Sequence, residues 1–201
     1  MRSILLAIAV GLIALSGCTT KTTNIDTSND EGRPVMGLDY RDFDRASAEL
    51  IESMVSSGVL NKPEGGRYVV ATGRVVNDTM QRIDTDQLMA KVEEELMNTG
   101  KVVLTSALGG SGAKDDMVYQ TRELRDNEEF DTETIAGKGQ LIAPELSLSG
   151  KIIQKDVKID KNETQVEYYF QILLTDISSG LRFWQNEVVL GKRGDRKSVS
   201  W

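Results

Sequence analysis

The chain has one cysteine, Cys18, and its surroundings predict a covalent modification of the thiol. It follows Leu15, Ser16 and Gly17, where an apolar stretch that begins at Ile4 comes to its end. This arrangement is typical of the bacterial lipobox, in which the cysteine thiol receives a diacylglyceryl group and the chain is cut before the cysteine. Cys18 is therefore expected to become the lipid-bearing first residue. An ordinary signal peptide with an unmodified cysteine is the alternative.

The residues before Cys18 are typical of a secretion signal. A basic start at Arg2 precedes an apolar stretch of twelve residues, whereas a helix needs about 20 to cross a bilayer. Residues 1–17 are therefore expected to be a lipoprotein signal peptide. Two or three acyl chains hold a protein to a membrane far more firmly than one. The mature chain is expected to be anchored to the membrane and not to span it.

Composition excludes several classes of function. Histidine is absent, which removes the commonest general base and metal ligand and every nucleophile pair that needs an imidazole. A formal net charge of -7 without a long basic block disfavours nucleic acid. We expect no metal, no cofactor and no small-molecule substrate. Proteins or the cell envelope are the expected partners.

Two motifs suggest further chemistry, and both have a simpler interpretation. The acidic triplet Glu93 to Glu95 resembles a set of metal ligands, but it falls on the polar side of a predicted helix. The loop Gly109-Gly110-Ser111-Gly112 follows a predicted strand without the spacing of a phosphate-binding loop. Asp115 and Asp116 would also repel an anion there. We expect a solvated helix face and a plain loop.

A polar segment separates the lipid site from the folded part of the chain. Residues 18–37, the lipidated cysteine and a flexible tether, contain too few apolar side chains to build a core. Residues 38–191 are expected to form one globular domain, followed by a tail at residues 192–201. The tether would reach roughly 65 Å if it were fully extended.

The domain is expected to alternate helices and strands before it ends in strands only. Helical spacing runs from Leu38 to Gly58, a β-branched strand covers Tyr68 to Val76, and a helix capped by Asp84 or Thr85 ends at Gly100. A short strand from Lys101 to Thr105 precedes a charged, helix-like segment from Asp115 to about Glu129, and a helical turn is expected within Ile135 to Leu141.

The pattern of apolar residues in the last third of the chain predicts an antiparallel three-strand meander. From Leu146 to Asp160 the apolar positions change phase, which a bulge or a change of burial near Ile152 would explain. Residues 165–174 alternate cleanly, and Leu181 to Leu190 returns as the hairpin partner. The predicted fold class is therefore α/β, a mixed sheet of about four to five strands flanked by helices.

Several segments together resemble the LpoB family of penicillin-binding-protein activators. They are Gly37-Leu38-Asp39-Tyr40-Arg41-Asp42-Phe43, Lys138-Gly139-Gln140-Leu141-Ile142-Ala143-Pro144, Leu148-Ser149-Gly150-Lys151-Ile152, and Leu174-Thr175-Asp176 with Gly180 and Phe183-Trp184. The resemblance covers about residues 35 to 191 and includes the lipobox. It implies a mixed sheet with flanking helices, like the N-terminal domain of TolB.

The resemblance also implies a function. Family members are outer-membrane lipoproteins whose periplasmic domain binds and stimulates class A penicillin-binding proteins, the enzymes that polymerise and cross-link peptidoglycan. Thr19, directly after the lipidated cysteine, is compatible with sorting to the outer membrane. We therefore expect a non-enzymatic activator that is anchored by lipid in the outer membrane, with its domain in the periplasm.

The candidate docking residues lie on the charged helical segment. They are Tyr119, Arg122 and Arg125, because tyrosine and arginine are enriched at binding hot spots. A merely solvated helix face is the alternative. For the protein as a whole, the alternatives are a component of a secretion or other envelope assembly with the same fold, and an enzyme that uses paired carboxylates.

Overall fold

The first described helix, α2 (Tyr40–Ser56), begins at a capping box. The Asp39 carboxylate accepts the Arg41 N–H at 3.0 Å, and the Asp42 carboxylate accepts the Asp39 N–H at 2.8 Å. Two backbone donors that a helix start would leave unpaired are thereby satisfied. The chain leaves the helix through Gly58, whose φ of 75° suits a residue without a side chain.

This computed structural model describes residues 24–27, 32, 34–110, 114–195 and 197. Residues from Val35 onward form a unit of their own. The expected signal peptide, Cys18 and Trp201 lie outside the described residues. After α2 come β1 (Tyr68–Asp78), α3 (Thr85–Asn98), β2 (Val102–Leu104), α4 (Met117–Glu123), β3 (Leu146–Lys158), β4 (Glu163–Asp176) and β5 (Arg182–Asp195). Short 3-10 turns cover Leu124–Asp126 and Thr132–Thr134.

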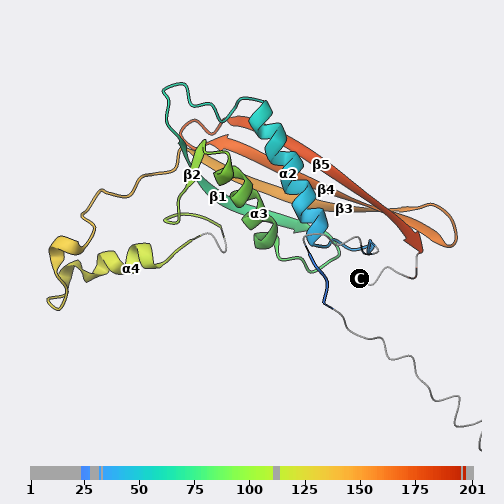
Figure 1. Ribbon diagram of the computed structural model, residues 1–201, viewed down its shortest axis with the longest axis horizontal. Coiled ribbons are helices and arrows are strands. Elements are labelled where there is room, and N and C mark those ends of the chain that lie inside the picture. Colours follow the sequence, from blue (N-terminus) through green and yellow to red (C-terminus); the bar gives the residue numbers. More distant parts are fainter. Residues whose placement is uncertain (1–23, 28–31, 33, 111–113, 196, 198–201) are drawn as a thin grey trace, which may run out of the picture. The chain divides into compact units, whose positions relative to one another are not determined.

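The strands form one mixed sheet in the order β2-β1-β3-β4-β5. The pairs of β1 with β2 and with β3 are parallel, and β3, β4 and β5 form an antiparallel meander. This architecture confirms the expected fold class. Figure 1 shows α2 and α3 side by side over the sheet.

The core lies between these two helices and one face of the sheet. In β4 every second side chain is buried, from Val166 to Leu174, while the residues between them are partly exposed. From α2, Phe43 meets Phe170 edge-on, with 6.2 Å between ring centroids. Leu88, Val92 and Leu96 of α3 are buried in the same core. The helices thus cover one face and leave the other to solvent.

The structure answers two expectations about short segments, the helical turn before β3 and the change of phase within β3. The predicted helical turn within Ile135 to Leu141 is wrong: the turn is a 3-10 helix at Thr132–Thr134, and Gly139 turns the chain with a φ of 76°. In β3 the phase change is one of burial, because its pairing with β4 is unbroken from Leu146 to Lys158. Ile152 is buried on the helix side, whereas Val157 points to the open side and is exposed.

The domain is longer at both ends than expected. Met36 belongs to the core, two residues before the expected domain start. Strand β5 continues to Asp195, so residues 192–195 are part of the sheet and not of a tail. The charged segment after the glycine loop contains a shorter helix than expected, because α4 ends at Glu123.

A carboxylate links the starts of β1 and β3. Glu145 accepts hydrogen bonds from the Lys62 ammonium at 2.5 Å and from the Val69 N–H at 3.0 Å. These two hydrogen bonds hold the pKa of Glu145 below its ordinary value of 4.5. The charged form is therefore the one that the folded domain favours.

We expect Glu145→Gln to make the domain less sensitive to acid. A lowered folded-state pKa adds stability that is present above the unfolded-state pKa and is lost as the pH falls through the folded-state pKa. The difference in thermal midpoint between the original chain and the variant should thus be largest near neutral pH and shrink towards pH ~3. A difference that stays constant over this range would contradict the assignment.

Candidate functional site

The predicted docking residues lie together, but each uses its polar group within the chain. The Tyr119 hydroxyl donates to the Ala107 carbonyl at 2.7 Å. The Arg122 guanidinium donates to the Val118 carbonyl one turn earlier in α4. The Arg125 guanidinium donates to the Ala136 carbonyl at 2.9 Å and to Gly137. All three side chains are half-buried, and their role in docking stays a prediction.

A hydrogen-bond network holds residues 36–38, where the expected tether would join the domain. The Tyr168 hydroxyl on β4 donates to the Met36 carbonyl at 3.0 Å and accepts a hydrogen bond from the Gln81 side chain. Gln81 in turn accepts the Leu38 N–H at 3.1 Å. Burial raises the pKa of Tyr168, so its hydroxyl keeps its proton and remains a donor.

An ion pair completes this junction from β5. The Lys192 ammonium donates to the Gly37 carbonyl at 2.6 Å and to the Asp42 carboxylate at 2.5 Å. The two side chains are only 11% and 14% exposed. Asp42 also closes the capping box of α2, so its carboxylate connects β5 to the start of α2. The Lys192 ammonium adds Gly37 to the same junction. The sequence analysis had placed Lys192 in the tail.

We expect Lys192→Met to destabilise the domain by roughly 3 kcal/mol, because removing one partner leaves a buried carboxylate without its cation. Urea unfolding followed by circular dichroism would measure this change. Lys161→Met, at an exposed position between β3 and β4, is the control and should change stability by less than about 0.5 kcal/mol. Equal stabilities for the two variants would show that the ion pair contributes nothing.

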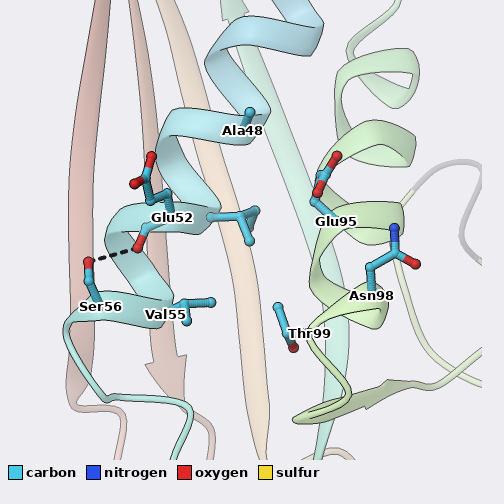
Figure 2. A pocket seen from close by; sticks show the side chains of 8 residues that line it. Ala48, Glu52, Val55, Ser56, Glu95, Asn98 and Thr99 are labelled. Carbon is cyan, nitrogen blue, oxygen red and sulfur yellow. Dashed lines mark hydrogen bonds between the residues drawn. The ribbon is translucent and has the colours of Figure 1, made fainter.

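A groove of about 440 Å³ runs between α2 and α3. Figure 2 shows Val55 of α2 facing Thr99, the residue directly after α3, with Glu95 also on the side of α3 that faces α2. The helices run in the same direction, since Lys91 of α3 pairs with Asp44 of α2 at 3.4 Å while both C-terminal turns line the groove. The lining residues are Ala48, Ile51, Glu52, Val55, Ser56, Glu95, Asn98 and Thr99.

A second hollow of about 290 Å³ lies beside the edge strand β2. Its lining is apolar or neutral, with Val103 and Leu104 from β2, Val118 from α4, and Leu141 and Ile142 from the connection to β3. Ile142 is 72% exposed. None of the described residues that line this hollow is charged, so its lining favours no one kind of partner.

The described residues offer neither a metal site nor a helix that could cross a membrane. They contain no group of three or more histidine, cysteine, aspartate or glutamate side chains that could hold a metal ion. Within the same part of the chain, no helix has the length and apolar character needed to cross a membrane.

Comparison with models of protein families shows which family the chain belongs to. The model of a family described as peptidoglycan-synthase activator LpoB matches residues 42–190. The chain belongs to the LpoB family. A search of curated proteins finds no match.

Solved LpoB domains are similar to this chain at low identity. The C-terminal domain of LpoB from Escherichia coli is 13% identical, with a TM-score of 0.45, over 74% of this chain and 98% of that one. The corresponding domain from Salmonella enterica is 15% identical, with a TM-score of 0.42 and the same coverage.

The segments that carry the LpoB resemblance build the fold. Residues 37–43 form the junction and the start of α2, Gly150 lies in the middle of β3, and Phe183 and Trp184 point to opposite faces of β5. The groove was missed in the sequence analysis. Its only sequence signal is the presence of Glu52 and Glu95 near the C-terminal ends of two helices, without a basic residue in either last turn.

Proposed function

We propose that this protein is a lipid-anchored activator that docks on a class A penicillin-binding protein and so regulates peptidoglycan synthesis. The observation that carries the proposal is the match of residues 42–190 to the family of peptidoglycan-synthase activators. The lipobox at Cys18 supports an anchor in the outer membrane, with the domain in the periplasm. The protein acts in this proposal as a binding protein and catalyses no reaction itself.

The physical mechanism is a shift in the population of synthase conformations. A bound domain raises activity only if it binds the active conformation more tightly than the inactive one. A tenfold preference corresponds to about 1.4 kcal/mol, which a few interface contacts supply. The docking domain therefore needs a specific surface, and no catalytic group.

The length of the tether limits where docking takes place. Because Met36 and Gly37 are held by Tyr168 and Lys192, the tether ends at about residue 35. Residues 19–35 span at most roughly 60 Å when fully extended. The synthase must therefore bring its docking surface within this distance of the outer membrane.

Reconstitution with a purified synthase tests the proposal. The chain from Thr19 onward should bind a class A synthase from the same cell and increase its rate of glycan polymerisation. Absence of binding to every such synthase would overturn the proposal. Co-purification of the lipidated protein from gently solubilised membranes in a large ring or secretion complex, without a synthase, would favour the alternative of an envelope assembly.

A further inference from the structure

The C-terminal ends of α2 and α3 create a region of negative potential. The last carbonyl groups of a helix carry a partial negative charge, which a lysine or arginine in the last turn usually compensates. Neither helix has a basic residue in its last turn. Because the helices run in the same direction, their two negative ends line the same part of the groove.

Two carboxylates add to this negative charge. Glu95 lies in the last turn of α3 and Glu52 one turn before the end of α2, and both line the groove. Among the described residues neither carboxylate has a hydrogen bond or an ion pair. Earlier along the same two helices, by contrast, Asp44 near the start of α2 is paired with Lys91 in the middle of α3. The carboxylate of Asp44 is thus compensated, whereas those of Glu52 and Glu95, further along the helices, are left open.

The floor of the groove is apolar. Ile51 is only 4% exposed, and Ala48 and Val55 lie beside it along α2. The alkyl stems of arginine and lysine cover apolar surface while their charged ends stay at the rim. A floor of this kind below two free carboxylates matches the shape and charge of such a side chain better than those of a purely apolar or an anionic group.

We propose that the groove between α2 and α3 binds a cationic, amphipathic segment of the partner protein. An arginine or lysine of that segment lies along Ile51 and Val55, and its charged end meets Glu52 and Glu95. The proposal rests on the proposed function, because the partner is taken to be the synthase. It differs from the predicted docking surface on α4 and the 3-10 turn that follows it, and it assigns the main contact to α2 and α3.

Charge reversal at the two glutamates tests the proposal. Glu52→Lys with Glu95→Lys should weaken binding of the class A synthase at least tenfold, and the weakening should diminish in 0.5 M sodium chloride as salt screens the pair. The thermal midpoint of the variant should be unchanged or higher, because a cation is favourable at a helix C-terminus. Loss of binding together with a stable fold would therefore report on docking alone.

A matched control changes the same charge elsewhere. Glu64→Lys with Glu133→Lys reverses two exposed carboxylates outside the groove. This variant should bind the synthase as the original chain does. If both variants bind equally, whether weakened or not, the groove has no special role and the inference is wrong while the proposed function stands.

A peptide titration keeps the test independent of the synthase. Acetyl-Leu-Arg-Ala-Leu-Arg-amide should shift the amide NMR signals of Ala48, Val55, Asn98 and Thr99, and the same peptide with citrulline in place of arginine should not. If no synthase binds the chain, the proposed function fails and this titration still decides about the groove. Absence of shifts, or equal shifts with both peptides, would overturn the inference.

Discussion

Cys18→Ala should abolish the activity of the protein in the cell and leave the activity of the purified chain in solution unchanged. Each methylene of an acyl chain that enters a membrane contributes about 0.8 kcal/mol, so loss of all acyl chains removes the anchor entirely. Without it, the domain no longer stays at a high effective concentration near its partner. The folded domain, which begins at about Met36, is not altered by this change.

Cell fractionation and a cell-wall synthesis assay would measure this effect. Ser16→Ala is the matched control, because it keeps a small residue in the lipobox and should retain both membrane attachment and activity. A Cys18→Ala protein that still fractionates with the outer membrane would contradict the assignment of Cys18 as the lipid site. Full cellular activity from a detached protein would contradict the need for an anchor.

Gly150→Ala should destabilise the domain by about 3 kcal/mol or more, since a forced overlap in a packed interior costs at least as much as overpacking. Gly150 lies in β3 between Val75 of β1 and Ile172 of β4. A Cβ atom there would approach the Ile172 Cδ1 atom to 2.6 Å and would overlap the Gln171 carbonyl. The backbone carbonyl cannot move without breaking the strand pairing.

Gly191→Ala is the matched control within the sheet. Apart from its chain neighbours, the described part of the chain places no atom within 4 Å of a Cβ added at Gly191. Alanine also restricts the unfolded chain more than glycine does. This control should be neutral or stabilising by up to about 1 kcal/mol. Urea unfolding of both variants would provide the comparison, and equal stability of the two would show that the close approach at Gly150 is not a constraint.

The two glutamates of the groove are expected to favour partner binding and to lower the stability of the domain. Carboxylates near a helix C-terminus each cost about 0.3–1 kcal/mol. Glu95 lies in the last turn of α3 and Glu52 one turn before the end of α2, and neither has an ion pair among the described residues. A binding surface tolerates this loss of stability because a positively charged partner turns the unfavourable negative potential into a favourable interaction on docking. Stability and binding should therefore respond in opposite directions to the same substitution.

Local patterns were sufficient to predict most of the elements. The spacing of Phe43, Ala46 and Leu50 predicted α2, and the alternation from Val166 to Leu174 predicted β4 with one buried face. Both patterns repeat along a single helix or strand. They depend only on which face of that element is buried, and not on which distant segments it contacts. The lipobox is equally local, so Cys18 could be singled out without any structure.

Contacts between distant segments could not be predicted in this way. Lys192 was assigned to a tail because the residues around it are basic and glycine-containing, yet it pairs with Asp42, 150 positions earlier. The helical turn was expected within Ile135 to Leu141, but Gly139 turns the chain there and the 3-10 turn precedes that segment. A short segment contains too few residues to show a periodic pattern of apolar positions, so contacts with distant parts of the chain decide its conformation.

The sequence by itself determined the order of helices and strands and the family resemblance, and it predicts the lipid anchor, because each of these depends on neighbouring residues. Only the tertiary structure decided where the domain begins and ends and which side chains share a groove. Glu52 and Glu95 become one site because α2 and α3 pack in the same direction on one face of the sheet. That packing is set by the whole core, and no short stretch of sequence contains it.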